Sequence, residues 1–199
     1  MIVVSFWLTQ PMVIRSHRNS DQTEAVSNAR QIGMALFEFE TEYGRFPDAR
    51  TIAEVQKKTG TLLPLDTRIS NDFFRQLIGS RIAQSEPMFY AKIRGARKPD
   101  GLMDPAHALT KGEVGFAYLS GLTSKGNPSR PIVVTPLIPG TDRFDPKPFD
   151  GRAIILKMDN SVTSMIIGKD GCVMANGKNL LDPTNPVWGS EKWTLVWPE

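Results

Sequence analysis

The chain has 199 residues, enough for one domain of ordinary size or a domain with an additional arm. Apolar residues make up 40% and charged residues 23%, which is typical of a folded domain and excludes a disordered chain. A single cysteine excludes an internal disulfide bond, and two histidines argue against a multi-histidine metal centre. The net charge of +3 does not indicate a nucleic-acid-binding arm, so we expect no nucleic acid among the partners.

The first 14 residues, MIVVSFWLTQPMVI, form an apolar segment that ends at Arg15. As a helix the segment would be about 21 Å long, shorter than the roughly 30 Å core of a bilayer. Three interpretations are open: a secretory signal peptide, a core element at a domain start, or the outer half of a transmembrane helix that begins upstream of Met1. We favour the third, because neither glycine nor proline occurs from Arg15 until Gly33 and helix-forming residues continue to Tyr43.

An apolar stripe at helical spacing follows the apolar segment. Its members, three or four residues apart, are Ala25, Ala29, Ile32, Leu36, Phe39 and Tyr43. Gly44 and Pro47 are stop signals. Joined to the apolar start, the stripe predicts one long helix that is apolar on all sides at first and amphipathic from Ala25. Pro11 would kink or interrupt this helix locally without ending it. Periodicity alone also allows an ordinary amphipathic helix packed on any core.

The stretch Ala25–Asp48, AVSNARQIGMALFEFETEYGRFPD, resembles the type IV pilins and the pseudopilins of type II secretion. Members of this superfamily begin with a long helix that is embedded in the membrane in its first half and packed on a sheet in its second. Many pseudopilins leave this helix through a Tyr-Gly-x-Phe/Tyr-Pro turn, which Tyr43–Pro47 matches. Pro11 resembles a proline often found late in the membrane half. The resemblance covers the first quarter of the chain well and the remainder in outline.

This resemblance implies a structural subunit of a pilus-like or pseudopilus-like filament and not an enzyme. It implies anchoring in the bacterial inner membrane, with the globular domain in the periplasm or outside the cell. The expected partners are copies of the chain or other pilin-like subunits, and the inner-membrane assembly machinery. Residues 1–24 would form the apolar segment and a polar spacer, and residues 25–199 a single globular domain. The expected assembly and membrane residues are Ile2, Val3, Val4, Phe6, Trp7, Leu8, Pro11, Val13 and Ile14.

Two short helices are predicted next. The first spans Thr51–Thr59, with a capping box formed by Thr51 and Glu54 and a stop at Gly60. The second is capped by Ser70, and its apolar face consists of Phe73, Phe74, Leu77, Ile78 and Ile82.

Short stretches rich in β-branched and aromatic residues then predict strands at 88–93, 114–119, 132–138, 153–158, 162–167, 172–174 and 194–197. Asp159-Asn160-Ser161 predicts a hairpin turn, and long loops are expected at 94–112, 121–131 and 139–151. The order predicts an α+β fold: a long N-terminal helix packed on a mostly antiparallel sheet in a pilin-like arrangement, with short helices and long loops.

Sites for catalysis or metal binding are weakly indicated. Cys172 with His107 as its base would make a nucleophile, but nothing in the sequence requires the two to meet, and we favour a buried or edge thiol. Asp182 and Asn185 with Glu191 would contribute oxygen ligands to calcium, as in some pseudopilins, yet an ordinary turn explains them better. We therefore expect no cofactor, while a hydrolase built on residues that no motif reveals remains an open alternative.

Two clusters allow binding functions. Lys92, Arg94, Arg97 and Lys98 would meet nucleic acid or an acidic partner, but a solvated strand end is favoured. Trp188, Trp193 and Trp197 crowd the C-terminus, where they would pack on the fold or bind a sugar ring. Binding of a sugar ring by these tryptophans would support the alternative function, a membrane-tethered or secreted binding domain for a carbohydrate or cell-wall ligand.

Overall fold

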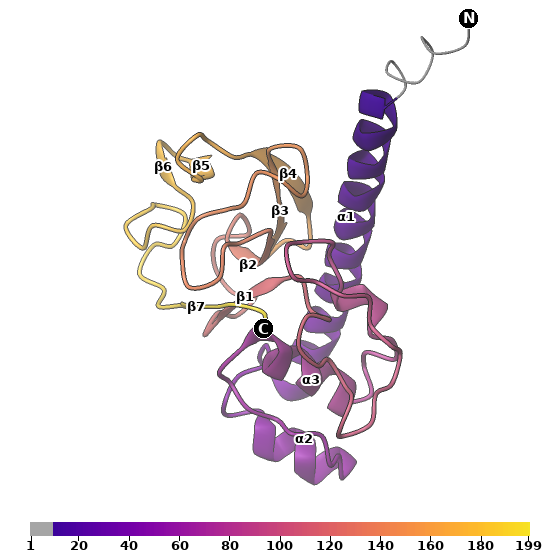
Figure 1. The fold of residues 1–199 in the computed structure, drawn as a ribbon. Coiled ribbons are helices and arrows are strands. Elements are labelled where there is room, and N and C mark those ends of the chain that lie inside the picture. Colours follow the sequence, from indigo (N-terminus) through magenta and orange to yellow (C-terminus); the bar gives the residue numbers. More distant parts are fainter. Residues whose placement is uncertain (1–9) are drawn as a thin grey trace, which may run out of the picture.

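A long helix runs along one side of the molecule in this computed structural model, which describes residues 10–199 and the side chains from Asn19 onward. This helix, α1, spans Gln10–Tyr43, and two shorter helices, α2 (Ile52–Thr59) and α3 (Ser70–Gly79), follow at its C-terminal end (Figure 1). A single 3-10 turn, η1 (Pro87–Phe89), lies between the helices and the sheet in the sequence.

The main sheet has five antiparallel strands in the order β4-β3-β2-β1-β7. Their bounds are β1 (Ala117–Ser120), β2 (Pro131–Thr135), β3 (Arg152–Lys157), β4 (Val162–Ile166) and β7 (Thr194–Val196). A separate two-stranded sheet pairs β5 (Met174–Ala175) with β6 (Lys178–Asn179). The predicted α+β class, with an N-terminal helix and a mostly antiparallel sheet, is therefore confirmed.

The amphipathic half of α1 packs on β3 and β4. The whole predicted stripe from Ala25 to Tyr43 is buried, and the helix ends at Tyr43 as predicted. Gly44 adopts φ 76°, a left-handed conformation that glycine takes without the steric cost of a side chain. β3 is buried at four consecutive positions, Ala153–Leu156, so both of its faces are covered. Figure 1 shows the C-terminal segments on the side of the sheet away from α1.

Neither predicted capping interaction forms, although both helices exist and Thr51 does occupy the N-cap position of α2. The Thr51 hydroxyl does not cap α2; it accepts from the Asp48 N–H at 3.0 Å and bonds to the Gln76 side chain of α3. Ser70 lies inside α3, and its hydroxyl donates to the Phe116 carbonyl at 2.7 Å. In each case the hydroxyl joins α2 or α3 to a neighbouring segment. Gly60 does end α2, at φ 67°.

The predicted strand at 88–93 is also wrong. Residues Pro87–Phe89 form η1, and an irregular segment follows. The side chain of Asn28 explains part of the difference, because its Nδ2 donates to the carbonyl oxygens of Pro87 and Tyr90, at 3.0 and 2.9 Å. Carbonyl groups that a strand would offer to a neighbouring strand are thus bound by α1.

The remaining strands agree with prediction to within a few residues at each end. The 159–161 turn joins β3 to β4, with Asn160 at φ 61°. The last short strand is shifted, because Val173 makes only a bridge to Ile167 and β5 begins at Met174. The hairpin that follows turns at Asn176-Gly177, with φ values of 52° and 74°. This Asn-Gly pair is the usual signal for such a turn, and the sequence analysis missed it.

Candidate functional site

The predicted assembly residues lie at and beyond the N-terminal end of α1. Six of them, Ile2, Val3, Val4, Phe6, Trp7 and Leu8, lie outside the described residues. Pro11, Val13 and Ile14 lie in α1, whose backbone is helical through Pro11. Figure 1 shows this part of α1 extending past the end of the sheet. Within residues 10–199, no helix has the length and apolar character needed to cross a membrane.

Polar contacts fix α1 to the domain just before the buried stripe begins. Asp21 forms an ion pair with Lys92 at 3.0 Å, and Gln22 Nε2 donates to Ser164 Oγ of β4 at 3.0 Å. About two helical turns further on, the buried Asn28 makes its two bonds to the η1 segment. Among the side chains that the structure describes, the contacts that hold α1 in its orientation on the domain therefore begin at Asp21.

At Gly33, α1 closely approaches the side chains of the β3–β4 hairpin. A Cβ atom there would lie 2.0 Å from Asn160 Oδ1 and 3.0 Å from Leu156 Cδ1. Glycine in a helix interior costs about 1 kcal/mol relative to alanine, and here it allows the hairpin tip to contact the helix backbone. Neither Gly33 nor Asn28 was singled out from the sequence, although a glycine within a helical pattern is a recognised signal of close packing.

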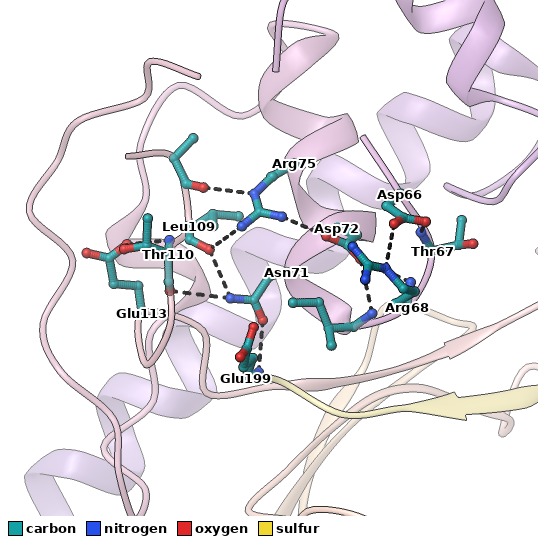
Figure 2. Close-up of polar contacts among 12 residues, drawn as sticks. Asp66, Thr67, Arg68, Asn71, Asp72, Arg75, Leu109, Thr110, Glu113 and Glu199 are labelled. Carbon is teal, nitrogen blue, oxygen red and sulfur yellow. Dashed lines mark hydrogen bonds and ion pairs between the residues drawn. The ribbon is translucent and has the colours of Figure 1, made fainter. Parts of the chain in front are cut away.

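A second feature is a polar clamp that holds the long loop 94–112 to α3. Asn71 Nδ2 and Arg75 Nη2 both donate to the Leu109 carbonyl oxygen, at 2.9 and 3.0 Å, and Arg75 also donates to the Ala108 carbonyl oxygen (Figure 2). Asp72 anchors the guanidinium, with Arg75 Nη1 2.6 Å from Asp72 Oδ1. The same Asn71 side chain accepts from the Glu199 N–H at 3.2 Å, so α3 binds the loop and the C-terminal residue together.

Two fully buried carboxylates complete this clamp. Glu86 accepts from the N–H groups of Leu109 and Gly101, at 2.8 and 2.9 Å. Glu113 accepts from the Thr110 N–H at 2.7 Å and pairs with Arg97 at 3.2 Å. Burial raises the pKa of Glu86, and the nearby Glu113 charge adds to the rise, while the two N–H bonds oppose it. The sequence offered no signal for either carboxylate.

Leu109 shows how firmly the clamp holds the loop. Its φ of 49° lies in the left-handed region, which costs energy for a residue with a side chain. The N–H of Leu109 bonds to Glu86, its carbonyl oxygen bonds to Asn71 and Arg75, and its side chain is buried. Contacts on both sides of this residue thus offset its backbone strain and fix the loop at one point.

The basic run is paired mostly within the chain. Lys92 pairs with Asp21, Arg97 with Glu113, and Arg94 with Asp145 at 3.6 Å. Arg94 and Asp145 also line a depression of about 190 Å³ formed with Ile93 and residues 136–139. These internal pairs support the interpretation of a solvated surface and leave few free cationic groups for an acidic partner.

The structure does not bring Cys172 and His107 together. Cys172 is buried, its Sγ contacts the Arg143 guanidinium, and its N–H donates to Asp170. Burial raises the pKa of the Cys172 thiol, which lowers its thiolate fraction and hence its reactivity. His107 instead pairs with Asp104 at 2.8 Å on the exposed loop. The described contacts therefore contain no cysteine–histidine pair.

The loop suggested for calcium is engaged in turn contacts. Asp182 accepts from the Thr184 N–H at 2.7 Å, Glu191 pairs with Arg130 at 3.4 Å, and Asn185 Nδ2 donates to the Ala175 carbonyl oxygen at 2.8 Å. The described part of the chain contains no group of three or more histidine, cysteine, aspartate or glutamate residues placed to hold a metal ion.

The three C-terminal tryptophans serve packing contacts. Trp188 is fully buried, and its Nε1 donates to the Leu180 carbonyl oxygen at 3.0 Å. Trp193 packs on Trp188 with ring centroids 4.4 Å apart, and Trp197 Nε1 donates to the Thr141 carbonyl oxygen at 2.8 Å. A stacking platform for a sugar needs an exposed ring face. Trp188 offers no exposed ring face, while Trp193 and Trp197 are partly buried and pack within the fold, as the packing interpretation expects.

Comparisons with protein-family models, with curated proteins and with solved structures found no match to this chain. A function is therefore inferred from the sequence and the geometry alone.

Proposed function

We propose that this protein is a structural subunit of a type IV pilus-like or type II secretion pseudopilus-like filament. Before assembly it is anchored in the bacterial inner membrane, with its globular domain in the periplasm or outside the cell. It works by assembling with copies of itself or with other pilin-like subunits, through the inner-membrane assembly machinery, and not as an enzyme.

The observation that carries this proposal is the division of α1 into two parts. From Ala25 to Tyr43 one stripe is buried on the domain, and polar contacts begin at Asp21. Towards Gln10 the same helix extends past the sheet (Figure 1) and leads back to the uncharged sequence Met1–Ile14. The helix that packs on the folded domain is therefore continuous in sequence with an apolar segment, and its described N-terminal part extends past the sheet.

The apolar N-terminal segment is expected to associate with a membrane or with other copies of the chain, for the following physical reason. A helix without tertiary contacts is only marginally stable in water, and apolar side chains all round it have no single face to bury. Insertion in a bilayer, and later packing among copies, would bury large residues such as Trp7 and Leu8. Each would contribute about 1.5–3 kcal/mol when fully buried. Anchoring and assembly thus use the same residues at successive stages.

A vesicle flotation assay tests the proposal. The 199-residue chain is purified in mild detergent, which is then removed in the presence or absence of phosphatidylethanolamine–phosphatidylglycerol vesicles. We expect flotation with vesicles, and ordered oligomers by electron microscopy without them. Val4→Asp and Leu8→Asp should abolish both, while Ser27→Asp, on the exposed face of α1, should abolish neither. A wild-type chain that neither floats nor assembles would refute the proposal.

A further inference from the structure

An exposed apolar patch lies at the end of the molecule away from the N-terminal part of α1. It consists of Leu62, Leu102 and Met103, whose exposed fractions are 83%, 49% and 37%. Leu62 and Met103 line a depression of about 290 Å³, where the segment after α2, the end of α3 and the loop 94–112 meet. Among the described lining residues Arg81 is the charged one. Leu102 does not line the depression but precedes Met103 directly in the chain. Exposed apolar residues at and next to a depression are typical of a binding surface.

The loop that carries two of the three patch residues is held in place. Leu102 and Met103 follow Gly101, whose N–H is bound by the buried Glu86 carboxylate. Further along the loop, Leu109 is fixed by Glu86, Asn71 and Arg75 (Figure 2). The patch is thus formed before anything binds, and a preorganised surface avoids the entropic cost of ordering a loop.

The position of the patch excludes binding of the chain's own N-terminal segment. Lys58 pairs with Glu42 at 2.8 Å, so the end of α2, where the depression begins, lies beside the C-terminal end of α1. From Gln10 to Glu42, α1 is about 48 Å long at 1.5 Å per residue. Residues 1–9, fully extended, reach about 30 Å from Gln10. The segment and the patch of one molecule therefore cannot meet.

We propose that the apolar patch binds the uncharged segment Ile2–Leu8 of a second copy of this chain. The two surfaces suit each other, because a segment of isoleucine, valine, phenylalanine, tryptophan and leucine meets a depression with little charge. The patch lies away from Gln10, the described end of α1 to which the segment is joined, so the contact is head-to-tail and repeats from copy to copy, as in an open filament. This inference rests on the proposed function and gives it a specific contact.

Disulfide cross-linking between two single-cysteine variants tests this contact. Both carry Cys172→Ser, which removes the native thiol; one adds Leu62→Cys and the other Val4→Cys. Each protein is purified full-length in detergent, the two are mixed, and the detergent is removed before mild oxidation. We expect a Leu62→Cys/Val4→Cys dimer in the mixture, at least ten-fold more abundant than with Met174→Cys, an exposed control position on β5 that replaces Leu62→Cys.

Each other outcome has a definite meaning. Leu62→Cys dimers that form without the second variant would show patch-to-patch pairing and overturn the proposal. Filaments visible by electron microscopy without the mixed cross-link would overturn this contact and leave the filament function standing. Absence of both filaments and cross-links would overturn the proposed contact and the proposed filament function together. Filaments that persist undiminished in Leu62→Asp/Met103→Asp would likewise exclude the patch as the binding site.

Discussion

Gly33 in α1 lies directly against Asn160 at the tip of the β3–β4 hairpin, with no room between them for a side chain on residue 33. Residues 127 positions apart in the sequence thus set the distance between the long helix and the sheet. On the same helix, Leu36 and Phe39 of the buried stripe are fully enclosed in the core.

Gly33→Leu should lower the free energy of unfolding by about 1–3 kcal/mol, the usual cost of forcing extra methylene groups into a packed site. Urea denaturation of both proteins measures the difference. Met34→Leu is the matched control, because residue 34 is exposed on the same turn and should leave the midpoint unchanged. Equal midpoints for wild type and Gly33→Leu would contradict the close packing.

Leu36→Asp and Phe39→Asp should each unfold the domain or lower its melting temperature strongly, because both side chains are fully buried. Burying an unpaired carboxylate costs several kcal/mol, against a total stability of roughly 5–15 kcal/mol. Circular dichroism melts measure the effect, and Ser27→Asp on the exposed face provides the control. If the buried variants melt like the control, the stripe does not face the core.

Arg75→Ala should loosen the loop 94–112. It removes three bonds to Ala108, Leu109 and Asp72, and leaves the buried Asp72 carboxylate without its cation, at a cost of about 2–3 kcal/mol. Hydrogen exchange should report faster exchange at the Leu109 amide. Arg68→Ala, whose guanidinium is exposed and pairs with the exposed Asp66, should leave both the stability and the Leu109 exchange rate nearly unchanged. Unchanged exchange at Leu109 in Arg75→Ala would contradict the clamp.

His107 should titrate with a pKa above the ordinary 6.5, because the Asp104 carboxylate hydrogen-bonds and attracts the imidazolium. The pair therefore stabilises the fold fully below pH 6.5, and this contribution is lost as the pH rises through the folded-state pKa of His107. Proton NMR titration of the imidazole measures the shift, and Asp104→Asn should return the pKa towards 6.5. An unshifted wild-type imidazole would show that the pair does not form in solution.

The sequence predicted the parts of the fold that local patterns encode. The stripe from Ala25 to Tyr43 and the stop at Gly44 define the end of α1, and the turn at Asp159–Ser161 locates the β3–β4 hairpin. These features depend on spacing and turn chemistry within a few residues. The class of fold followed from the order of such elements.

The features of the fold that the sequence did not predict depend on contacts between residues far apart in the chain. The segment 88–93 has strand-like composition, yet Asn28 of α1 binds the carbonyl groups of Tyr90, within it, and of Pro87, just before it. Ser70 has the chemistry of a cap, but its hydroxyl lies beside the Phe116 carbonyl. Glu86 and Glu113 look like ordinary surface carboxylates in the sequence, and only the path of the loop 94–112 buries them. The patch at Leu62 and Met103 arises in the same way, from segments that the fold brings together.

The most direct test of the filament proposal is removal of residues 1–18 followed by size-exclusion chromatography and a thermal melt. The described contacts that fix α1 begin at Asp21, and the buried stripe begins at Ala25, so the truncated chain keeps both. We predict a soluble, monomeric domain that melts within about 4 °C of the full-length protein, a shift of about 1 kcal/mol or less, and that neither floats with vesicles nor assembles. A truncated chain that is insoluble or melts many degrees lower would show that the apolar segment belongs to the core, and would contradict its role in anchoring and assembly.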